Sequence, residues 1–171
     1  MHKIAYYITA HGFGHAVRSL EIVRCLQRRA PDIEITLVSE IPEFLVVQNV
    51  GRFLPFRRKR LDIGLSQLDS IRFDLESTLS SLVQLRTESQ RLVEEESRFL
   101  ERERVDLIVA DIPFLPFRAA RHSGIPSLGA ANFTWDWIYG AYAHRDPRWS
   151  DLIRWIKESY ALCDLLLRLP M

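Results

Sequence analysis

Cysteine is scarce in this 171-residue chain, which contains only Cys25 and Cys163. The two lie far apart and neither belongs to a Cys-x-x-Cys pair, which argues against a disulfide framework and against a cysteine-based zinc site. We expect both thiols to fill core positions of helices instead. An excess of charge is also missing, because 23 basic and 22 acidic residues leave a net charge of +1. The basic surface typical of nucleic-acid-binding domains is therefore not expected.

Long hydrophobic runs are absent as well. No apolar stretch approaches the roughly 18 residues that span a bilayer. The first residues, 1–3, lead directly into an apolar segment and lack the pattern of a secretory signal peptide. We therefore expect a cytoplasmic protein without a transmembrane segment.

What the chain does contain is a hydrophobic fraction of 47%, enough to bury a core. Apolar runs alternate with segments of helical period, which is typical of a parallel α/β sheet. This pattern predicts one α/β domain over residues 1–171, a Rossmann-like parallel sheet with helices on both faces. Strands are predicted at 4–9, 33–39, 54–58, 105–110, 126–131 and 165–169, and helices at 16–29, 42–49, 74–103, 116–123, 135–144 and 148–162.

Two regions depart from this alternation. Residues 59–72 have no clear period and are predicted to form a long loop, a kind of segment that is often functional in compact domains. The basic run 57–60 just before it is interpreted as a solvated edge. The chain ends two residues after the predicted buried strand at 165–169, which suggests an α/β domain cut before a further part of the protein.

The run from His11 to Ser19 (His-Gly-Phe-Gly-His-Ala-Val-Arg-Ser) is the most informative motif of the chain. It joins the first predicted strand to the first predicted helix. Gly12 and Gly14 let the backbone approach a ligand closely, and the start of a helix offers free N–H groups and a positive dipole end. The run is not a dinucleotide-binding G-x-G-x-x-G because Val17 replaces the third glycine, and it lacks the Gly-Lys-Ser/Thr ending of a phosphate-binding loop.

Three loops with unusual side chains should meet at one edge of the sheet, because ligands bind beyond the carboxyl ends of parallel strands. They are residues 11–15, 111–114 and 132–137. A histidine that donates one ring N–H to a carboxylate is oriented to take a proton with its other nitrogen. His15 and Asp111 are therefore predicted to form a catalytic pair, although each residue alone is also a plausible helix cap.

Further candidate contacts to substrate come from these loops, from the first predicted helix and from the long loop 59–72: His11, Gly12, Gly14, Arg18, Gln67, Asp69, Asn132, Trp135 and Asp136. Arg18 is a candidate for an anion, or for an ordinary ion pair. Trp135 offers a ring face on which a sugar could pack. Trp137 is interpreted as a core residue.

These segments together resemble the amino-terminal half of GT-B glycosyltransferases, and in particular the glycosyltransferase-like part at the amino-terminal half of plant arabinokinases. The resemblance covers nearly the whole chain in order: His11–Ser19, residues 62–64 and 67–70, Val109–Pro113, and Asn132–Tyr139. It implies the N-terminal half of a GT-B fold, in which two Rossmann-like halves enclose a cleft and this half binds the acceptor.

The resemblance places His15 on the family's catalytic base and Asp111 on its acidic partner. It implies no metal, and no cofactor bound by this half, since the nucleotide-sugar donor belongs to a C-terminal half or partner chain that is missing here. The expected function is the acceptor-binding half of an inverting, metal-independent glycosyltransferase acting on a small-molecule or glycan acceptor, with the isolated chain inactive. Two alternatives are a non-catalytic sugar- or nucleotide-binding module, as in a kinase fusion, and half of a nucleotide-sugar epimerase.

Overall fold

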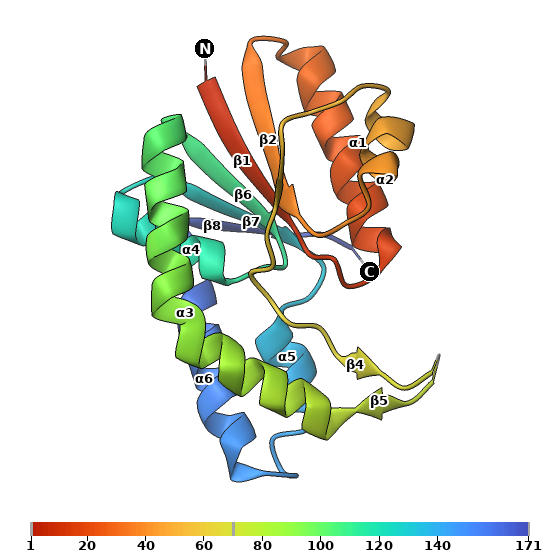
Figure 1. Ribbon diagram of the computed structural model, residues 1–171, viewed down its shortest axis with the longest axis vertical. Helices are drawn as coiled ribbons and strands as arrows, with labels where there is room; N and C mark the ends of the chain where they lie inside the picture. The colour runs from red at the N-terminus through yellow and green to blue at the C-terminus, as the bar shows by residue number, and fades with distance from the viewer. Residues whose placement is uncertain (1, 70, 171) are drawn as a thin grey trace.

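The computed structural model describes residues 2–69 and 71–170, so the positions 1, 70 and 171 lie outside it. Its main feature is a six-stranded sheet in the order β3-β2-β1-β6-β7-β8, in which every neighbouring pair is parallel (Figure 1). The Rossmann-like α/β class predicted from the sequence is therefore confirmed. The elements are β1 (His2–Ile8), α1 (Phe13–Arg29), β2 (Ile33–Ser39), α2 (Glu43–Val50), β3 (Phe56–Arg58), β4 (Ser66–Gln67), β5 (Phe73–Asp74), α3 (Leu75–Glu103), β6 (Leu107–Asp111), α4 (Leu115–Ser123), β7 (Ser127–Ala131), α5 (Trp135–Gly140), α6 (Pro147–Tyr160) and β8 (Leu165–Arg168).

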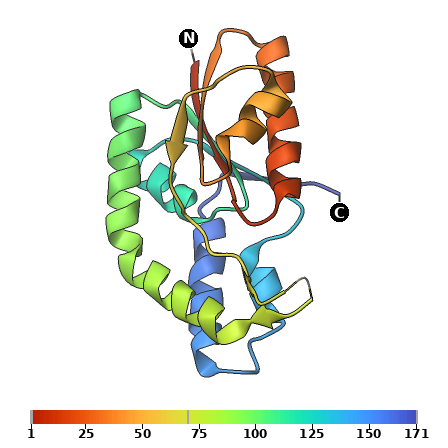
Figure 2. The ribbon, with the colours of Figure 1, turned by 45° about the vertical axis from the view of Figure 1, so that its right-hand side comes forward.

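The strand order reverses between β1 and β6. From β1 the chain moves outward through β2 to β3, and it then returns through α3 to build β6, β7 and β8 on the other side of β1. Helices α1 and α2 cover one face of the sheet, and α3 and α4 cover the other (Figures 1 and 2). Such a reversal opens a crevice at the carboxyl ends of the two central strands. His15, in the first turn of α1, and Asp111, the last residue of β6, meet there.

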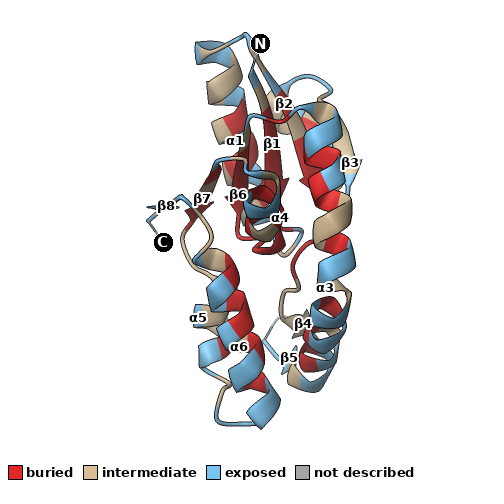
Figure 3. Ribbon diagram, turned by 90° about the vertical axis from the view of Figure 1, so that its left-hand side faces the viewer, coloured by how far each residue is buried: buried red, intermediate tan, exposed pale blue. Residues whose placement is uncertain are grey.

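Two hydrophobic clusters hold the layers together, one on each face of the sheet (Figure 3). Side chains alternate between the faces of a strand, so β1 serves both clusters. Tyr6 packs with Leu20 of α1 on one side, while Tyr7 packs with Leu100 of α3 on the other. The residues of β1 that flank the crevice are therefore fixed from both faces.

A second group of elements extends past the carboxyl edge of the sheet. It consists of the first turns of α3, helices α5 and α6, and the short antiparallel pair β4–β5 (Figures 1 and 2). Trp149 of α6 is buried in the same cluster as Leu79 of α3, which connects this group to the core of the sheet. Within the described part of the chain, none of the helices has the length and apolar character needed to cross a membrane.

Local sequence signals explain most of the helix ends. Asp74 caps α3 by accepting a hydrogen bond of 2.9 Å from the Ser77 amide. Gly51 and Gly124 end α2 and α4 in the left-handed conformation that glycine adopts without strain, as the sequence predicts. Helix α1 starts at Phe13, earlier than predicted, so that His15 lies in its first turn.

Two predictions about loops and strands need correction. The segment 59–72 is not entirely loop, because it contains β4, which pairs with β5 to form a small hairpin. The last strand is present, but it is not buried: all four residues of β8 are exposed because it is the edge strand of the sheet. Leu165, Leu166 and Leu167 remain 53%, 43% and 44% exposed.

The predicted environment of the cysteines is also wrong. Cys25 lies on α1 but is only half-buried, and its thiol faces the charged side of the helix, 3.5 Å from Glu21 Oε1. Cys163 follows α6 and belongs to no helix. Neither thiol fills a closed core position.

The basic run 57–60 is a solvated edge only in part, because Arg58 and Arg60 are exposed while Arg57 and Lys59 are not. Arg57 binds the fully buried carboxylate of Glu96 at 2.6 Å, and Lys59 binds Glu95 at 2.6 Å. These ion pairs connect the third strand and the segment after it to α3. Arg57 and Lys59 are thus paired within the fold, while the side chains of Arg58 and Arg60 remain exposed.

Candidate functional site

His15 and Asp111 lie in contact at the carboxyl edge of the two central strands. Asp111 is the last residue of β6, and its side chain is 1% exposed. His15 Nδ1 lies 3.1 Å from Asp111 Oδ1, and the imidazole is 13% exposed. The arrangement leaves the other ring nitrogen, Nε2, turned away from the carboxylate, because the two nitrogens lie on opposite sides of the ring. The predicted pair is therefore formed in the structure.

The carboxylate of Asp111 has further partners on α1. Arg18 Nη2 donates to both of its oxygens, at 2.8 and 2.9 Å, and Ser19 Oγ donates to Oδ2 at 2.6 Å. Residues three and four positions after His15 share its helix face, which explains why all three reach the same carboxylate. Arg18 is thus committed to an internal ion pair, the plainer of the two alternatives that the sequence leaves open.

The backbone around Asp111 is held in place with some strain. Its carbonyl accepts a hydrogen bond from the Thr9 amide at 3.2 Å, which ties the end of β6 to the end of β1. The next residue, Ile112, is buried and has a φ of 81°, a conformation that costs a β-branched residue energy. The Tyr160 hydroxyl fixes this turn by donating to the Ile112 carbonyl at 2.6 Å. The packing of Ile112 and the hydrogen bond from Tyr160 therefore offset the strain of the turn directly behind the carboxylate.

Two tautomers of neutral His15 are compatible with its neighbours. If Nδ1 carries the proton, it donates to Asp111, and Nε2 is free to accept a proton from a ligand. If Nε2 carries the proton, Nδ1 accepts from Arg18 Nη2, which lies 3.0 Å away. Only the tautomer with the proton on Nδ1 leaves Nε2 free to act as a base. The function of the pair therefore depends on whether Nδ1 donates to Asp111 or accepts from Arg18.

His11 lies on the other side of the loop from Asp111. Its ring meets Trp135 edge to face at a centroid distance of 5.2 Å. Gly64 packs directly against it: a methyl group on that residue would lie 2.2 Å from His11 Nδ1. Burial, together with the charge of His15, lowers the pKa of His11. His11 is thus held as a neutral ring at the mouth of a cleft.

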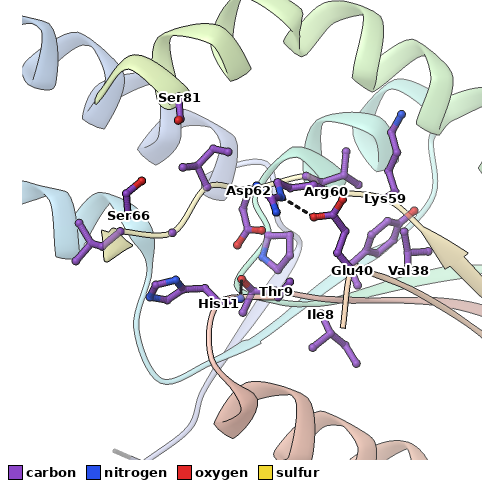
Figure 4. Close-up of a pocket in the computed structure, with 17 residues that line it drawn as sticks. Ile8, Thr9, His11, Val38, Glu40, Lys59, Arg60, Asp62, Ser66 and Ser81 are labelled. Atoms are coloured by element: carbon purple, nitrogen blue, oxygen red, sulfur yellow. Dashed lines mark hydrogen bonds and ion pairs between the residues drawn. The ribbon is translucent and has the colours of Figure 1, made fainter. Parts of the chain in front are cut away.

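That cleft has a volume of about 210 Å³ and runs between the end of β1 and the segment 59–66 (Figure 4). The Asp62 carboxylate points into it near His11 and Thr9, and its Oδ2 accepts the Trp135 indole N–H at 2.8 Å. Burial raises the pKa of Asp62. At the mouth, Arg60 pairs with Glu40 at 2.6 Å. The cleft is polar and bounded by His11, but His15 does not line it.

A second hollow of about 210 Å³ lies at the ends of β7 and β8. Phe133 is one of its walls, and the same ring meets His15 edge to face at 5.3 Å. Asn132 and Trp137 also line it. The Oδ1 atom of Asn132 is buried without a hydrogen-bond partner among the described residues. The hollow therefore adjoins the His15–Asp111 pair through the Phe133 ring.

The two tryptophans have the opposite environments from those predicted. Trp135 is 1% exposed and stacks on Tyr139 at 5.5 Å, so its faces are covered and cannot receive a sugar. Trp137 is 62% exposed and faces the hollow, although the sequence suggested a core residue. Both lie in the first turn of α5, and their positions on the helix decide which one faces the core.

The remaining residues predicted to contact substrate are two glycines at the start of α1 and two polar residues near the β4–β5 turn. Gly12 is exposed at the cap of α1 with a φ of 88°, and Gly14 is exposed in the first turn, so both leave backbone open at the helix start. Asp69 instead holds the β4–β5 turn by accepting from the amides of Ile71 and Arg72. Gln67 is exposed within the same hairpin.

Asp136 follows the buried tryptophan of α5, and its Oδ1 is buried without a partner among the described residues. The sequence assigned no individual role to Ser19, Asp62 or Phe133, although it singled out the segments that contain them. Helical spacing from His15 would have identified Ser19, which lies four residues later on the same face. The roles of Asp62 and Phe133 depend on contacts between distant segments, for which a single sequence carries no local signal.

Comparison with known proteins places this geometry in context. No family model matches the chain. L-arabinokinase from Arabidopsis thaliana is 34% identical over 174 residues, a match that covers 97% of this chain and 16% of that protein. The chain therefore spans about one sixth of the length of this relative.

Solved structures with a similar fold cover nearly the whole chain. A putative UDP-N-acetylglucosamine 2-epimerase from Listeria monocytogenes aligns with a TM-score of 0.60 and 10% identity, over 97% of this chain and 38% of that one. UGT2 from Phytolacca americana, complexed with UDP-2fluoro-glucose and pterostilbene, aligns with a TM-score of 0.57 and 12% identity, over 97% of this chain and 47% of that one. At these identities the likeness concerns the fold.

In both comparisons the chain matches less than half of the solved protein, as one Rossmann-like half of a GT-B enzyme does. The chain thus has the fold of a GT-B half, and it is similar in sequence, along nearly all of its length, to a segment of plant L-arabinokinase.

Proposed function

We propose that this chain is the acceptor-binding half of an inverting, nucleotide-sugar-dependent glycosyltransferase. The observation that carries the proposal is the contact of 3.1 Å between His15 Nδ1 and the buried carboxylate of Asp111. A fixed imidazole with one free nitrogen at the carboxyl edge of a parallel sheet is suited to deprotonate a hydroxyl group.

In the proposed reaction, His15 Nε2 takes the proton of an acceptor hydroxyl as its oxygen forms a bond to the anomeric carbon of the donor. The bond from that carbon to the nucleotide breaks on the opposite side, and the nucleotide leaves with the electron pair. Asp111 keeps the Nδ1 proton in place and stabilises the imidazolium that forms. The donor would be held by a second Rossmann-like half or a partner chain.

Arg18 and Ser19 act as positioning residues in this proposal. They occupy both oxygens of Asp111 from the α1 side and fix the carboxylate in the plane that His15 needs. The positive charge of Arg18 also offsets the cost of burying the carboxylate before any proton is transferred. The strained turn at Ile112 holds the same group from behind.

A non-catalytic sugar-binding module is the second candidate, and one observation favours it: the sequence match to L-arabinokinase extends over 97% of the chain. In such a module the same crevice would bind a sugar while a separate domain of the protein carried out the chemistry. Replacing His15 would then weaken sugar binding without changing the rate constant of that other domain.

The test is glycosyl transfer by the full-length gene product, assayed with a panel of nucleotide-sugars and hydroxyl acceptors. His15→Ala should lower kcat by about 10²-fold or more, the usual contribution of a general base. His122→Ala is the matched control, since His122 is an exposed histidine on α4, and it should leave the rate unchanged. Near-normal turnover by His15→Ala would rule out the base, and a sugar kinase activity unaffected by it would favour the binding module.

A further inference from the structure

The hollow at the ends of β7 and β8 combines features of a binding site for a charged sugar. Trp137 exposes 62% of its surface, although an indole is among the most costly side chains to leave in water. Asn132 Oδ1 is buried and lacks a partner among the described residues, which is a cost that a ligand hydroxyl could remove. An exposed ring beside an unsatisfied amide is the combination with which proteins hold sugars, with the ring on the C–H face and the amide on a hydroxyl.

Arg168 adds a positive charge to the same hollow. It is the last residue of β8 and lies beside Ala131 in the sheet, so its side chain stands at the carboxyl edge. Arg168 makes no ion pair with the residues that the structure describes, so no carboxylate among them neutralises its charge. Thr134 also faces the hollow, and its hydroxyl makes no capping hydrogen bond to α5.

The hollow adjoins the catalytic pair through one side chain. Phe133 lines the hollow and also contacts the His15 ring at 5.3 Å. A molecule that rests on Trp137 and Phe133 therefore lies one aromatic ring away from His15, across Phe133. The volume of about 210 Å³ is smaller than the sites of drug-sized ligands and suits a single small ring.

We propose that this hollow binds a negatively charged monosaccharide, in which the ring packs on Trp137, a hydroxyl bonds to Asn132, and the carboxylate or phosphate group pairs with Arg168. The inference rests on the function proposed above and extends it, because it names an anionic sugar as the class of acceptor presented to His15. It does not require Trp135, whose faces are covered.

The test measures binding rather than transfer, using calorimetry on the 171-residue chain with D-glucuronate, D-glucose 6-phosphate and D-glucose. At least one of the two anionic sugars should bind roughly tenfold more tightly than glucose, as expected for one charge-assisted contact. Arg168→Gln should abolish that preference, and Trp137→Ala should weaken binding of the anionic sugar by about tenfold. Binding of glucuronate alone identifies a carboxylate ligand, and binding of the phosphate sugar alone identifies a phosphate ligand.

Matched controls separate the hollow from the rest of the surface. Phe53→Ala removes another exposed aromatic ring, and Arg154→Gln removes another exposed arginine, so neither should change affinity. Equal affinity for glucose, no binding of any probe, or unchanged affinity in Arg168→Gln would overturn the proposal. His15→Ala should keep the binding, since His15 does not line the hollow. Near-normal transfer by His15→Ala with retained binding would therefore refute the base and leave the anionic site standing, whereas lost transfer with retained binding supports both.

Discussion

At the scale of single residues, the proposed chemistry depends on His15, and two groups compete for its Nδ1 atom. Asp111 Oδ1 lies 3.1 Å away and Arg18 Nη2 lies 3.0 Å away. One is an acceptor and the other a donor, so they favour opposite tautomers. The hydrogen bonds of Arg18 to both carboxylate oxygens provide it with another place to donate, which favours the Nδ1–H form that a base requires.

His11 gives the fold a pH dependence that can be measured. Burial lowers its pKa, so near and below the ordinary value of about 6.5 the unfolded chain binds a proton that the folded chain resists. The free energy of unfolding should therefore fall as the pH drops through this range, down to the lowered pKa of the folded state. Urea unfolding at pH 7.5 and 5.5 should show a larger loss for the wild type than for His11→Gln. Equal losses would mean that His11 is not held as a neutral ring.

Gly64 offers a second test of how closely the His11 ring is packed, because it lies directly against that ring. Because an added methyl would lie 2.2 Å from His11 Nδ1, Gly64→Ala should displace the His11 ring and lower the free energy of unfolding by about 1–3 kcal/mol. Gly140→Ala is the control, since nothing lies within 4 Å of a methyl there. A Gly64→Ala variant as stable as the Gly140→Ala variant would contradict the close packing. Thermal unfolding of both variants supplies the comparison.

Part of the site could be predicted from residues alone. The pairing of His15 with Asp111 follows from the loop order of a parallel sheet, because both residues come directly after strands whose ends lie side by side. The exchange of roles between Trp135 and Trp137 could not be predicted, since both are large, apolar and two positions apart in a short helix. Trp135 is held in the core by its stacking on Tyr139 and by its hydrogen bond to Asp62, which lies 73 residues away in the sequence.

At the scale of elements, one buried ion pair connects β1, β3 and α3. Glu96 of α3 is fully buried and accepts from the Tyr7 hydroxyl at 2.8 Å and from Arg57 Nη1 at 2.6 and 2.8 Å. The Arg57 guanidinium also lies over the Phe99 ring, 4.5 Å from its centroid. A buried carboxylate that loses its only cation is costly, so this cluster contributes to holding α3 on the sheet.

Two neighbouring arginines should therefore differ sharply in their effect on stability. Arg57→Gln should lower the free energy of unfolding by about 3 kcal/mol, because it leaves Glu96 charged and buried. Arg58→Gln should cost less than about 1 kcal/mol, because the pair of Arg58 with Glu43 is exposed and 3.7 Å long. Chemical denaturation of both variants gives the two values. Similar costs would contradict the role assigned to the buried pair.

Element types and most boundaries were accessible from the sequence, because apolar period and capping residues act locally. The helix ends at Gly51 and Gly124 and the start at Asp74 are examples. The β4–β5 hairpin was missed because each strand has only two residues, too few for an alternating pattern. The exposure of β8 was missed because three consecutive leucines have the composition of a buried strand.

At the scale of the whole molecule, the reversal of strand order between β1 and β6 creates the site, and the two cores fix it. The class of fold and the edge at which a ligand binds follow from the alternation of strands and helices. The full strand order does not follow from this alternation, since it depends on where the returning α3 delivers β6. The match to one sixth of L-arabinokinase agrees with the use of this unit within a larger protein.

Stability should be concentrated in the two cores and not in the edge strand. Leu82 of α3 is fully buried, so Leu82→Ala should lower the free energy of unfolding by about 2–5 kcal/mol. Leu167 of β8 is 44% exposed, so Leu167→Ala should cost less than about 1 kcal/mol. Urea unfolding of this matched leucine pair tests the distribution. Equal costs would show that β8 is covered in solution.

The central claim is that Asp111 holds His15 as a base, and the most direct measurement is the tautomer of His15. Nitrogen-15 NMR of the imidazole, recorded at a pH where the ring is neutral, distinguishes a proton on Nδ1 from a proton on Nε2. The account predicts the Nδ1–H tautomer in the wild type, with loss of this preference in Asp111→Asn. A proton on Nε2 in the wild type would mean that Nδ1 accepts from Arg18 and that His15 has no free nitrogen with which to deprotonate an acceptor.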